Sequence, residues 1–259
     1  MNIINNFSME CFSLIGKTAM ITGASKGIGQ GIALALAKAG ADIFAVVHHE
    51  DFNDTKKLIE QEGVRVDYYV CDLGDKKEVN RAVDKCIKAF GRLDILVNNA
   101  GMIKRAPILE YKDEDFENVL ELNLSSVFYL SREAGKIMEK QGGGKIVNIA
   151  SMLSFQGGKY VPAYTASKHG VVGLTKSFAN ELSEKNIQVN AIAPGYIITN
   201  NTEALINDKK RYEEITSRIP AERWGTPYDL MGAVVFLSSR ASDYVTGHTL
   251  AVDGGWLVR

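Results

Sequence analysis

The sequence predicts an α/β fold in which a doubly wound parallel sheet of about seven strands carries helices on both faces. Two observations carry this prediction. Short apolar runs alternate with helical stretches of about 10 to 15 residues, a pattern typical of repeated βαβ units. The length of 259 residues also lies within the range of one α/β domain. We therefore expect a single domain over residues 1–259, without a repeat.

The composition is that of a globular protein with a sizeable core, since 46% of the residues are hydrophobic and 24% are charged. Thirty basic residues against 31 acidic ones leave a net charge of −1, so no electrostatic footprint for nucleic acid is visible. The three cysteines are widely spaced and suggest no metal site. No basic residue precedes Lys17, and no apolar run approaches about 18 residues. We expect a cytoplasmic protein without a signal peptide, a membrane span or a metal ion.

The first half of the chain is predicted to alternate between strands and helices, after a polar leader at residues 1–10 that we expect to be loose. Apolar runs predict strands at 18–21, 43–47, 65–70 and 93–97. The helices between them are predicted at 31–39, 54–61 and 75–90. A glycine follows the first and the last of these helices, as is common at helix ends.

The second half of the chain continues the pattern. One long helical region is predicted at 113–141, followed by a strand at 146–149 and a helix that runs to about residue 185. Further strands at 188–192 and 248–252 flank a helix at 228–239. Residues 197–220 are polar with helical patches, and we expect this segment to cover bound substrate and exclude water.

The glycine-rich turn Thr22–Gly29 follows the first predicted strand directly. Its spacing is G-x-x-x-G-x-G, which lets the backbone come close to a pyrophosphate. The charge of a pyrophosphate suits the exposed N–H groups at the start of a helix. A tight structural turn is the alternative. The strand before the turn and the helix after it favour a Rossmann-like dinucleotide site.

The end of the second predicted strand gives a mixed signal about which dinucleotide binds. An acid at this place holds the ribose 2′-hydroxyl of NAD, whereas a basic group favours the 2′-phosphate of NADP. Here Val47 is apolar, His48 is weakly basic, and Lys26 in the glycine-rich turn adds a cation. The neighbouring His48 and His49 are also explained as solvated loop residues.

The loops after the third and fourth strands supply further candidates. Asp72 closes the third strand, where a carboxylate can contact an adenine ring or cap the next helix. The amide-rich Asn98–Gly101 suits a backbone that lies against a flat ligand, and a simple turn explains it almost as well. Lys104 and Arg105 follow on the same loop. Such charges are usually solvated, and recognition of an anionic substrate group is the alternative.

The stretch from Ser151 to Lys168 calls for a chemical explanation. Tyr164 and Lys168 are four residues apart, so they share one face of a helix. An ammonium about 5 Å from a phenol, at an effective dielectric of about 20, favours the phenolate by roughly 3 kcal/mol, about two pKa units below a reference near 10. Such pairs also occur by chance. Ser151, however, follows an apolar strand and offers a hydroxyl at the ligand-binding edge of the sheet.

Six motifs occur in an order that resembles the short-chain dehydrogenase/reductase family: Thr22–Gly29, Asn98–Gly101, Asn123, Ser151, the pair Tyr164 and Lys168, and Pro194–Gly195. The resemblance extends from Phe12 onward, and no catalytic position departs from the family pattern. It implies that Tyr164 is the acid/base and that Ser151 holds the substrate oxygen. It further implies that Lys168 binds the nicotinamide ribose and lowers the tyrosine pKa, and that Asn123 anchors a proton-relaying water.

The same resemblance implies the contacts of a nicotinamide dinucleotide. They come from the glycine-rich turn and from the loops at the carboxyl ends of the strands: Gly23, Ser25, Lys26, Gly27, Ile28, Gly29, His48, Asp72, Leu73, Asn99, Ala100, Gly101, Tyr164, Lys168, Pro194, Gly195, Ile197 and Thr199. NAD is the cofactor expected by analogy, and NADP remains open.

Further segments, at 149–158, 190–196, 199–202, 218–225 and 251–256, are similar to those of family members that act on sugar acids. The implied reaction interconverts the C5 ketone and alcohol of a keto-deoxy sugar acid (2,5-diketo-3-deoxygluconate to 2-keto-3-deoxygluconate) in uronate degradation. The implied substrate contacts are Arg105, Ser151, Gln156, Tyr164 and Asn200, with Arg223 as a further candidate. The resemblance also implies a homotetramer.

Three alternatives stay open from the sequence. The chain could reduce 5-ketogluconate, or it could reduce acyl or other ketones. It could also be a dinucleotide-binding regulator without turnover, although the complete set of catalytic positions argues against this.

The apolar ending Trp256–Val258 either lies at a subunit contact or folds back on its own chain.

Overall fold

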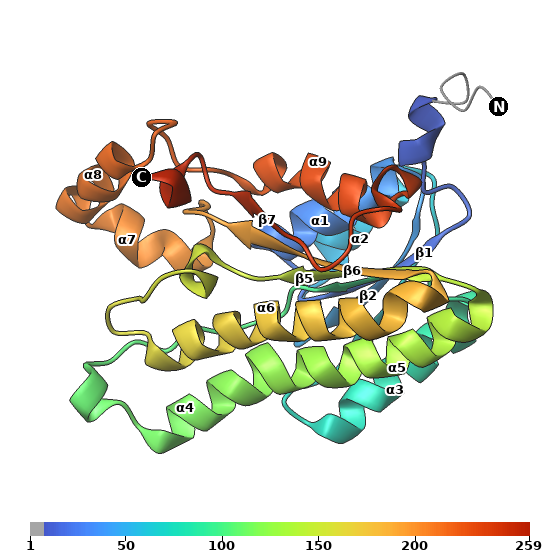
Figure 1. Ribbon diagram of the computed structural model, residues 1–259, viewed down its shortest axis with the longest axis horizontal. Helices are drawn as coiled ribbons and strands as arrows, with labels where there is room; N and C mark the ends of the chain where they lie inside the picture. Colours follow the sequence, from blue (N-terminus) through green and yellow to red (C-terminus); the bar gives the residue numbers. More distant parts are fainter. Residues whose placement is uncertain (1–7) are drawn as a thin grey trace.

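A single parallel sheet of seven strands forms the centre of the structure, a computed structural model that describes residues 8–259 (Figure 1). The strand order is β3-β2-β1-β4-β5-β6-β7, and each pair of neighbours is parallel. The strands are β1 (Thr18–Thr22), β2 (Asp42–Val47), β3 (Val66–Val70), β4 (Ile95–Asn98), β5 (Gly144–Ile149), β6 (Ile187–Pro194) and β7 (Thr249–Val252). The predicted fold class is confirmed.

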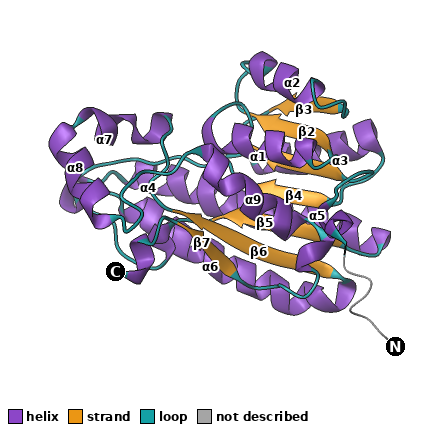
Figure 2. Cartoon of the chain, turned by 90° about the horizontal axis from the view of Figure 1, so that it is seen from above, coloured by secondary structure: helices purple, strands orange, loops and turns teal. Residues whose placement is uncertain are grey.

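Helices cover both faces of the sheet (Figures 1 and 2). One face carries α1 (Gly27–Lys38), α2 (Asn53–Glu60) and α9 (Pro227–Ser238). The other face carries α3 (Lys76–Phe90), α4 (Asp113–Leu120), α5 (Ser126–Gln141) and α6 (Pro162–Leu182). The strand order reverses between β1 and β4, so the carboxyl ends of these strands flank the crevice where open α/β sheets bind ligands.

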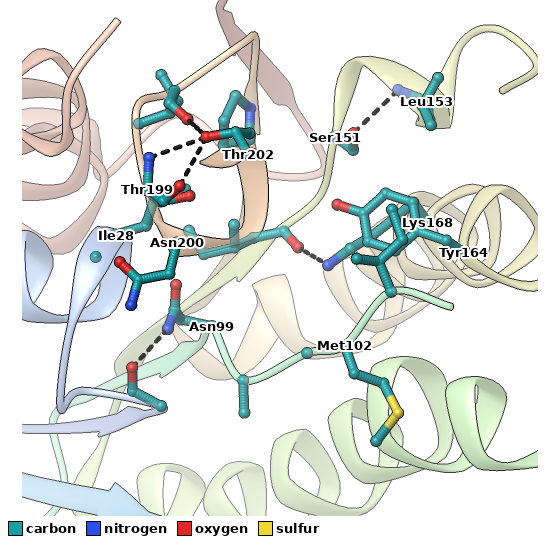
Figure 3. A pocket seen from close by; sticks show the side chains of 18 of the residues that line it. Ile28, Asn99, Met102, Ser151, Leu153, Tyr164, Lys168, Thr199, Asn200 and Thr202 are labelled. Atoms are coloured by element: carbon teal, nitrogen blue, oxygen red, sulfur yellow. Dashed lines mark hydrogen bonds between the residues drawn. The ribbon is translucent and has the colours of Figure 1, made fainter. Parts of the chain in front are cut away.

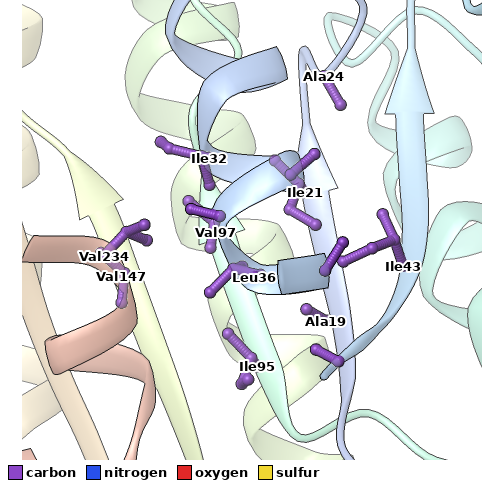
Figure 4. Close-up of a cluster of buried hydrophobic side chains, with 14 of the residues drawn as sticks. Ala19, Ile21, Ala24, Ile32, Leu36, Ile43, Ile95, Val97, Val147 and Val234 are labelled. Atoms are coloured by element: carbon purple, nitrogen blue, oxygen red, sulfur yellow. The ribbon is translucent and has the colours of Figure 1, made fainter. Parts of the chain in front are cut away.

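The core beneath α1 explains why the first strand and helix form where they do. All five residues of β1 are buried, and Ile21 packs with Ile32 and Leu36 of α1 and with Val97 of β4 (Figure 4). Because β1 lies between two other strands, both of its faces must be apolar. Gly31 lets α1 approach α9 closely, since a Cβ at this position would lie 2.8 Å from Pro227 Cβ.

Two helices differ from the sequence prediction. Helix α1 begins at Gly27, four residues before the predicted start. Glycines normally weaken a helix, but Gly29 and Gly31 lie where the neighbouring chain leaves no room for a Cβ, so they belong to this helix for steric reasons. The long helical region at 113–141 is interrupted by a widened π turn at Glu121–Ser125. A π turn inserts one residue per turn and is frequent at functional sites, but apolar periodicity does not reveal it.

The predicted covering segment contains the short helices α7 (Glu203–Asn207) and α8 (Lys209–Arg218). Its end packs in an aromatic cluster where the ring of Trp224 stacks on Tyr212 at 5.2 Å and lies 5.0 Å from Tyr196. Trp256 joins this cluster and is buried, so the chain ending folds back on its own chain at this residue. The fold-back alternative thus holds at Trp256, whereas Val258 is exposed.

The leader prediction is only partly open to inspection. Met9–Phe12 form a 3-10 helix whose N-cap is Ser8, so this end of the predicted loose leader has regular structure. The rest of the leader lies outside the described residues. No helix within residues 8–259 is long and apolar enough to cross a membrane.

Candidate active site

A cavity of about 1130 Å³ opens at the carboxyl edge of the sheet. Apart from Arg223, each residue that the sequence predicts to contact cofactor or substrate lines this cavity. These residues come from positions 23 to 200 of the chain, and the sheet topology brings them to one edge (Figure 3). Asn123 is completely buried beside it.

The glycine-rich turn has the shape that a diphosphate requires. A Cβ on Gly29 would lie 2.0 Å from the carbonyl oxygen of Gly23, so only glycine lets the turn close this tightly. Gly23 itself has a φ of 67°, in the left-handed region. The first N–H groups of α1 have no partner within the helix, and they line the cavity through Gly27, Ile28 and Gly29. The turn therefore fits the phosphates of a nicotinamide dinucleotide.

Thr22, the last residue of β1, ties this turn to the loop after β4. Its hydroxyl oxygen accepts hydrogen bonds from the N–H groups of Asn99 and Ala100, both at 2.9 Å. The Asn99 side-chain amide donates to the carbonyl oxygens of Thr22 and Gly23 at 2.8 and 3.1 Å. This role of Thr22 is not among the predictions from the sequence. A hydroxyl at the carboxyl end of a buried strand, directly before the glycine-rich turn, is the signal that marks it.

Helix α2 supports the turn from its other side. The buried hydroxyl of Thr55 donates to the carbonyl oxygen of Ser25 at 2.8 Å and accepts from the side-chain amide of Gln30 at 2.7 Å. Sequence reasoning missed this contact, since 30 residues separate Ser25 from Thr55. The contact fixes the glycine-rich turn relative to α2.

The end of β2 carries no carboxylate at the position that distinguishes the ribose 2′-hydroxyl of NAD from the 2′-phosphate of NADP. Val47 is buried, and the exposed His48 places its Nδ1 3.0 Å from Nε2 of His49. Lys26 is the N-cap residue of α1, and Asp51 lines the cavity beyond the histidines. The structure, like the sequence, therefore leaves both NAD and NADP as candidate cofactors.

The structure shows the contacts of the loop residues Asp72 and Lys104, whose roles the sequence leaves open. Asp72 accepts a hydrogen bond from the N–H of Gly74 at 2.9 Å and lines the cavity, while Asp75 is the residue that caps α3. The helix-capping reading of Asp72 is therefore wrong. Lys104 lies 3.6 Å from the carboxylate of Asp115, and the exposed Arg105 lines the cavity.

Ser151 is held at the end of β5 by a capping box. Its hydroxyl oxygen accepts from the N–H of Leu153 at 3.1 Å, and its own N–H donates to the hydroxyl of Ser154 at 3.3 Å. Ser154 in turn donates to the carbonyl oxygen of Lys168 at 2.7 Å. The serine is thereby fixed to α6, the helix that carries Tyr164 and Lys168 (Figure 3).

The Tyr164 and Lys168 side chains lie together as predicted, with the lysine Nζ 5.6 Å from the centre of the tyrosine ring. Lys168 is buried, and its Nζ donates to the carbonyl oxygen of Ile149 at 2.6 Å. Burial lowers the pKa of Lys168 to about 8, because the charged form loses hydration.

The predicted effect of Lys168 on Tyr164 is wrong. Burial raises the pKa of Tyr164, and only a hydrogen bond with Ser151 and the charge of Arg105 act in the opposite direction. The cost of removing a phenolate from water exceeds the attraction of the ammonium, and this cost depends on burial in the folded chain. The phenol of Tyr164 is consequently protonated at neutral pH.

Asn123 lies in the π turn and joins three parts of the site. Its side-chain oxygen accepts from the N–H of Met102 at 2.9 Å, and its side-chain nitrogen donates to the Met102 carbonyl at 2.9 Å. The same nitrogen donates to the hydroxyl of Ser167 at 3.2 Å, and Ser167 donates to the Tyr164 carbonyl at 2.7 Å. The buried amide is thus satisfied by backbone and a serine, which links the β4 loop to α6.

The substrate side of the cavity contains both expected and unexpected residues. Gln156 and Asn200 line it as expected. Arg223 does not, because it pairs with Asp229 at 2.6 Å beside a separate, smaller cavity. Sequence reasoning missed Tyr196, Arg211, Arg218 and Trp256, which line the main cavity from the covering segment and the chain ending.

The fold and the site together define a nicotinamide-dependent oxidoreductase, with a dinucleotide cradle next to a serine, a tyrosine and a lysine. Comparisons with known proteins agree. The profile of a family described as enoyl-(acyl carrier protein) reductase matches residues 23–257. A 2-dehydro-3-deoxy-D-gluconate 5-dehydrogenase of Bacillus subtilis is 55% identical over 252 residues, covering 96% of this chain and 98% of the relative.

Solved structures show the same relationship. A proposed NAD(P)-dependent gluconate 5-dehydrogenase of Beutenbergia cavernae, with bound NADP at low occupancy, has a TM-score of 0.93 at 48% identity. A proposed 2-deoxy-D-gluconate 3-dehydrogenase of Agrobacterium tumefaciens with bound NADP has a TM-score of 0.90 at 49% identity. Each comparison covers 96% of this chain and 99% of the other. The chain belongs to the short-chain dehydrogenase/reductase family and is an NAD(P)-dependent enzyme that acts on CH–OH groups. The alternative of a regulator without turnover is set aside.

Proposed function

We propose that this enzyme interconverts the C5 ketone and alcohol of a keto-deoxy sugar acid, reducing 2,5-diketo-3-deoxygluconate to 2-keto-3-deoxygluconate. The observation that carries the proposal is the 55% identity with the B. subtilis dehydrogenase over nearly the full length of both chains.

The charge of the cavity supports an anionic substrate. Outside the dinucleotide part, the lining cations are Lys104, Arg105, Lys159, Arg211 and Arg218, and the lining carboxylates are Glu121 and Glu214. An excess of positive charge in a concave site attracts and orients anions. An uncharged or long-chain ketone would favour a more apolar lining.

The side chains divide the work of the reaction between them. A bound reduced nicotinamide supplies the hydride. Ser151 holds the ketone oxygen, and the phenol of Tyr164 gives that oxygen its proton. The raised pKa of Tyr164 keeps the phenol protonated at neutral pH, which is the form that reduction needs. Lys168, the glycine-rich turn and the loops at the strand ends, which include Asn99, hold the dinucleotide. Asn123 anchors a water that relays protons.

Both dinucleotides are proposed cofactors. The end of β2 has the apolar Val47 in place of an acid, so this position places no carboxylate against a 2′-phosphate. Lys26 and His48 line the same cavity and can face that phosphate. NAD lacks the 2′-phosphate but can make all the other contacts of the dinucleotide. The solved relatives with bound NADP support this assignment.

A homotetramer is also proposed. Phe116 of α4 and Phe128 of α5 keep 38% and 37% of their surface exposed on the same outer layer of helices. Exposed aromatic side chains of this kind are common at contacts between subunits. Sedimentation equilibrium measures the mass directly, and a monomer would contradict the proposal.

Steady-state kinetics test the proposed substrate. 2,5-Diketo-3-deoxygluconate, 5-ketogluconate and a β-ketoacyl thioester are each compared with NADH and with NADPH, and cofactor absorbance is followed. We expect the highest kcat/KM for the keto-deoxy acid. A preference for 5-ketogluconate would favour the gluconate dehydrogenase alternative, and a preference for the thioester would overturn the assignment to sugar acids.

A further inference from the structure

Arg218, the last residue of α8, lies against the chain ending. Its guanidinium carbon is 4.0 Å from the centre of the Trp256 ring, and both residues line the main cavity. Stacking on an aromatic face fixes the plane of a guanidinium and leaves its N–H groups available at the edge. Arg218 is therefore oriented before any substrate arrives.

The partners of the cavity cations distinguish Arg218 from its neighbours. Lys104 lies 3.6 Å from Asp115, and Arg211 lies 3.2 Å from Glu214. Within residues 8–259, no carboxylate lies within ion-pair distance of Arg218. The indole Nε1 of Trp256 is also buried without a hydrogen-bond acceptor among the described residues, although the side chain borders the cavity. Among the described residues, the Arg218 guanidinium thus has no carboxylate partner, and the Trp256 Nε1 beside it has no acceptor.

The wall that carries these donors is firmly built. The carboxylate of Asp253 accepts from the N–H groups of Gly255 and Leu257, both at 2.9 Å, which folds the chain ending into a tight turn. The ring of Tyr196 packs against Trp256 at 4.9 Å. Arg259 donates to the carbonyl oxygen of Ser217 at 3.1 Å and ties the turn to the end of α8.

We propose that Arg218, held on Trp256, binds the carboxylate of the sugar acid at the wall formed by α8 and the C-terminal turn. The inference rests on the proposed function and assigns one end of the substrate. Arg105 acts nearer the reacting end, since its charge reaches the Tyr164 phenol, whereas the charge of Arg218 reaches Tyr196. The carboxylate and C5 lie at opposite ends of the substrate, so a second cation is needed away from Tyr164.

The test compares a charged and an uncharged form of one substrate. The 5-keto sugar acid and its methyl ester are offered to the unchanged protein, to Arg218→Gln and to Arg218→Lys. We expect Arg218→Gln to raise the KM of the acid at least tenfold, to leave that of the ester within twofold, and to leave the KM of the dinucleotide unchanged. Arg218→Lys should recover part of the loss. An acid-to-ester preference that stays the same in Arg218→Gln overturns the proposal.

Two controls separate this result from other causes. Lys210→Gln removes a cation from the same helix at an exposed position outside the cavity, and it should leave the acid-to-ester preference intact. If the unchanged protein turns over neither compound, the proposed function fails. In that case, calorimetric titration of the protein and NADP with D-gluconate still tests whether Arg218 binds a carboxylate. Loss of gluconate binding only in Arg218→Gln supports the carboxylate contact, and equal binding in both proteins excludes it.

Discussion

Tyr164 is the residue on which the chemistry depends most directly. Its phenol is proposed to protonate the substrate oxygen, and a positioned general acid contributes about 10²- to 10⁴-fold. Tyr164→Phe removes that proton and little else, because the ring still packs beside Lys168. We expect kcat to fall by about 10³-fold, while the dissociation constant of NADPH, measured by fluorescence, changes less than threefold. Retention of most of the turnover would remove Tyr164 from its role.

Lys168 gives the site a dependence on pH. Its pKa of about 8 means that the ammonium is present below this pH and is lost as the pH rises above it. Tyr164 does not titrate in this range, because its pKa is raised. If the ammonium holds the dinucleotide, kcat/KM with the dinucleotide varied should decline above about pH 8. Initial rates from pH 6 to 10 measure this decline.

A matched variant assigns the decline to the lysine. Lys168→Arg keeps a positive charge across the whole pH range, so its lower activity should no longer decline above about pH 8. A decline of the same shape in the variant would show that another group titrates.

At the residue scale, the sequence predicted the groups that carry chemistry better than those that position them. Ser151, Tyr164 and Lys168, the proposed catalytic groups, belong to short-range motifs, and they line one cavity as predicted. Thr22 and Arg218 contact residues far along the chain, Asn99 and Trp256, and no local pattern predicts such contacts. The pKa of Tyr164 was predicted in the wrong direction because burial is a property of the folded chain.

At the scale of elements, α2 and the glycine-rich turn are connected by one buried hydroxyl. Thr55→Val keeps the shape of the side chain but removes its hydrogen bonds to Ser25 and Gln30. The turn should lose its fixed position, because a partly buried carbonyl is left without its donor. We expect the KM of the dinucleotide to rise about three- to tenfold, with kcat at saturation and the KM of the sugar acid unchanged.

Two further variants test whether this effect belongs to the hydroxyl. Thr55→Ser retains the donor and should recover binding of the dinucleotide. Ser242→Ala removes another fully buried hydroxyl, one that donates to the Ser239 carbonyl at 3.1 Å away from the cavity. It should lower stability without changing the KM of the dinucleotide. Equal effects of Thr55→Val and Ser242→Ala on that KM would leave Thr55 with a structural role alone.

Elements were predicted best where one period dominates. Strands such as β1 and β6 are buried on both faces, as central parallel strands are, and their largely apolar runs predict them correctly. The π turn at Glu121–Ser125 was read as plain helix, since one inserted residue barely alters the apolar pattern. That insertion is nevertheless what brings Asn123 to Met102 and Ser167.

At the scale of the whole molecule, one cavity draws residues from the glycine-rich turn, the strand ends and the covering segment. If residues 1–259 form a single domain, a dinucleotide should stabilise all of it together. At a concentration 100 times its dissociation constant, NADPH adds about 2.7 kcal/mol to the free energy of unfolding. Each kcal/mol raises the Tm of a chain of this size by about 2–4 °C. Scanning calorimetry should therefore show one transition that moves upward by about 5–10 °C. Two transitions, of which NADPH moves only one, would divide the chain into separate cooperative units and contradict the single-domain proposal.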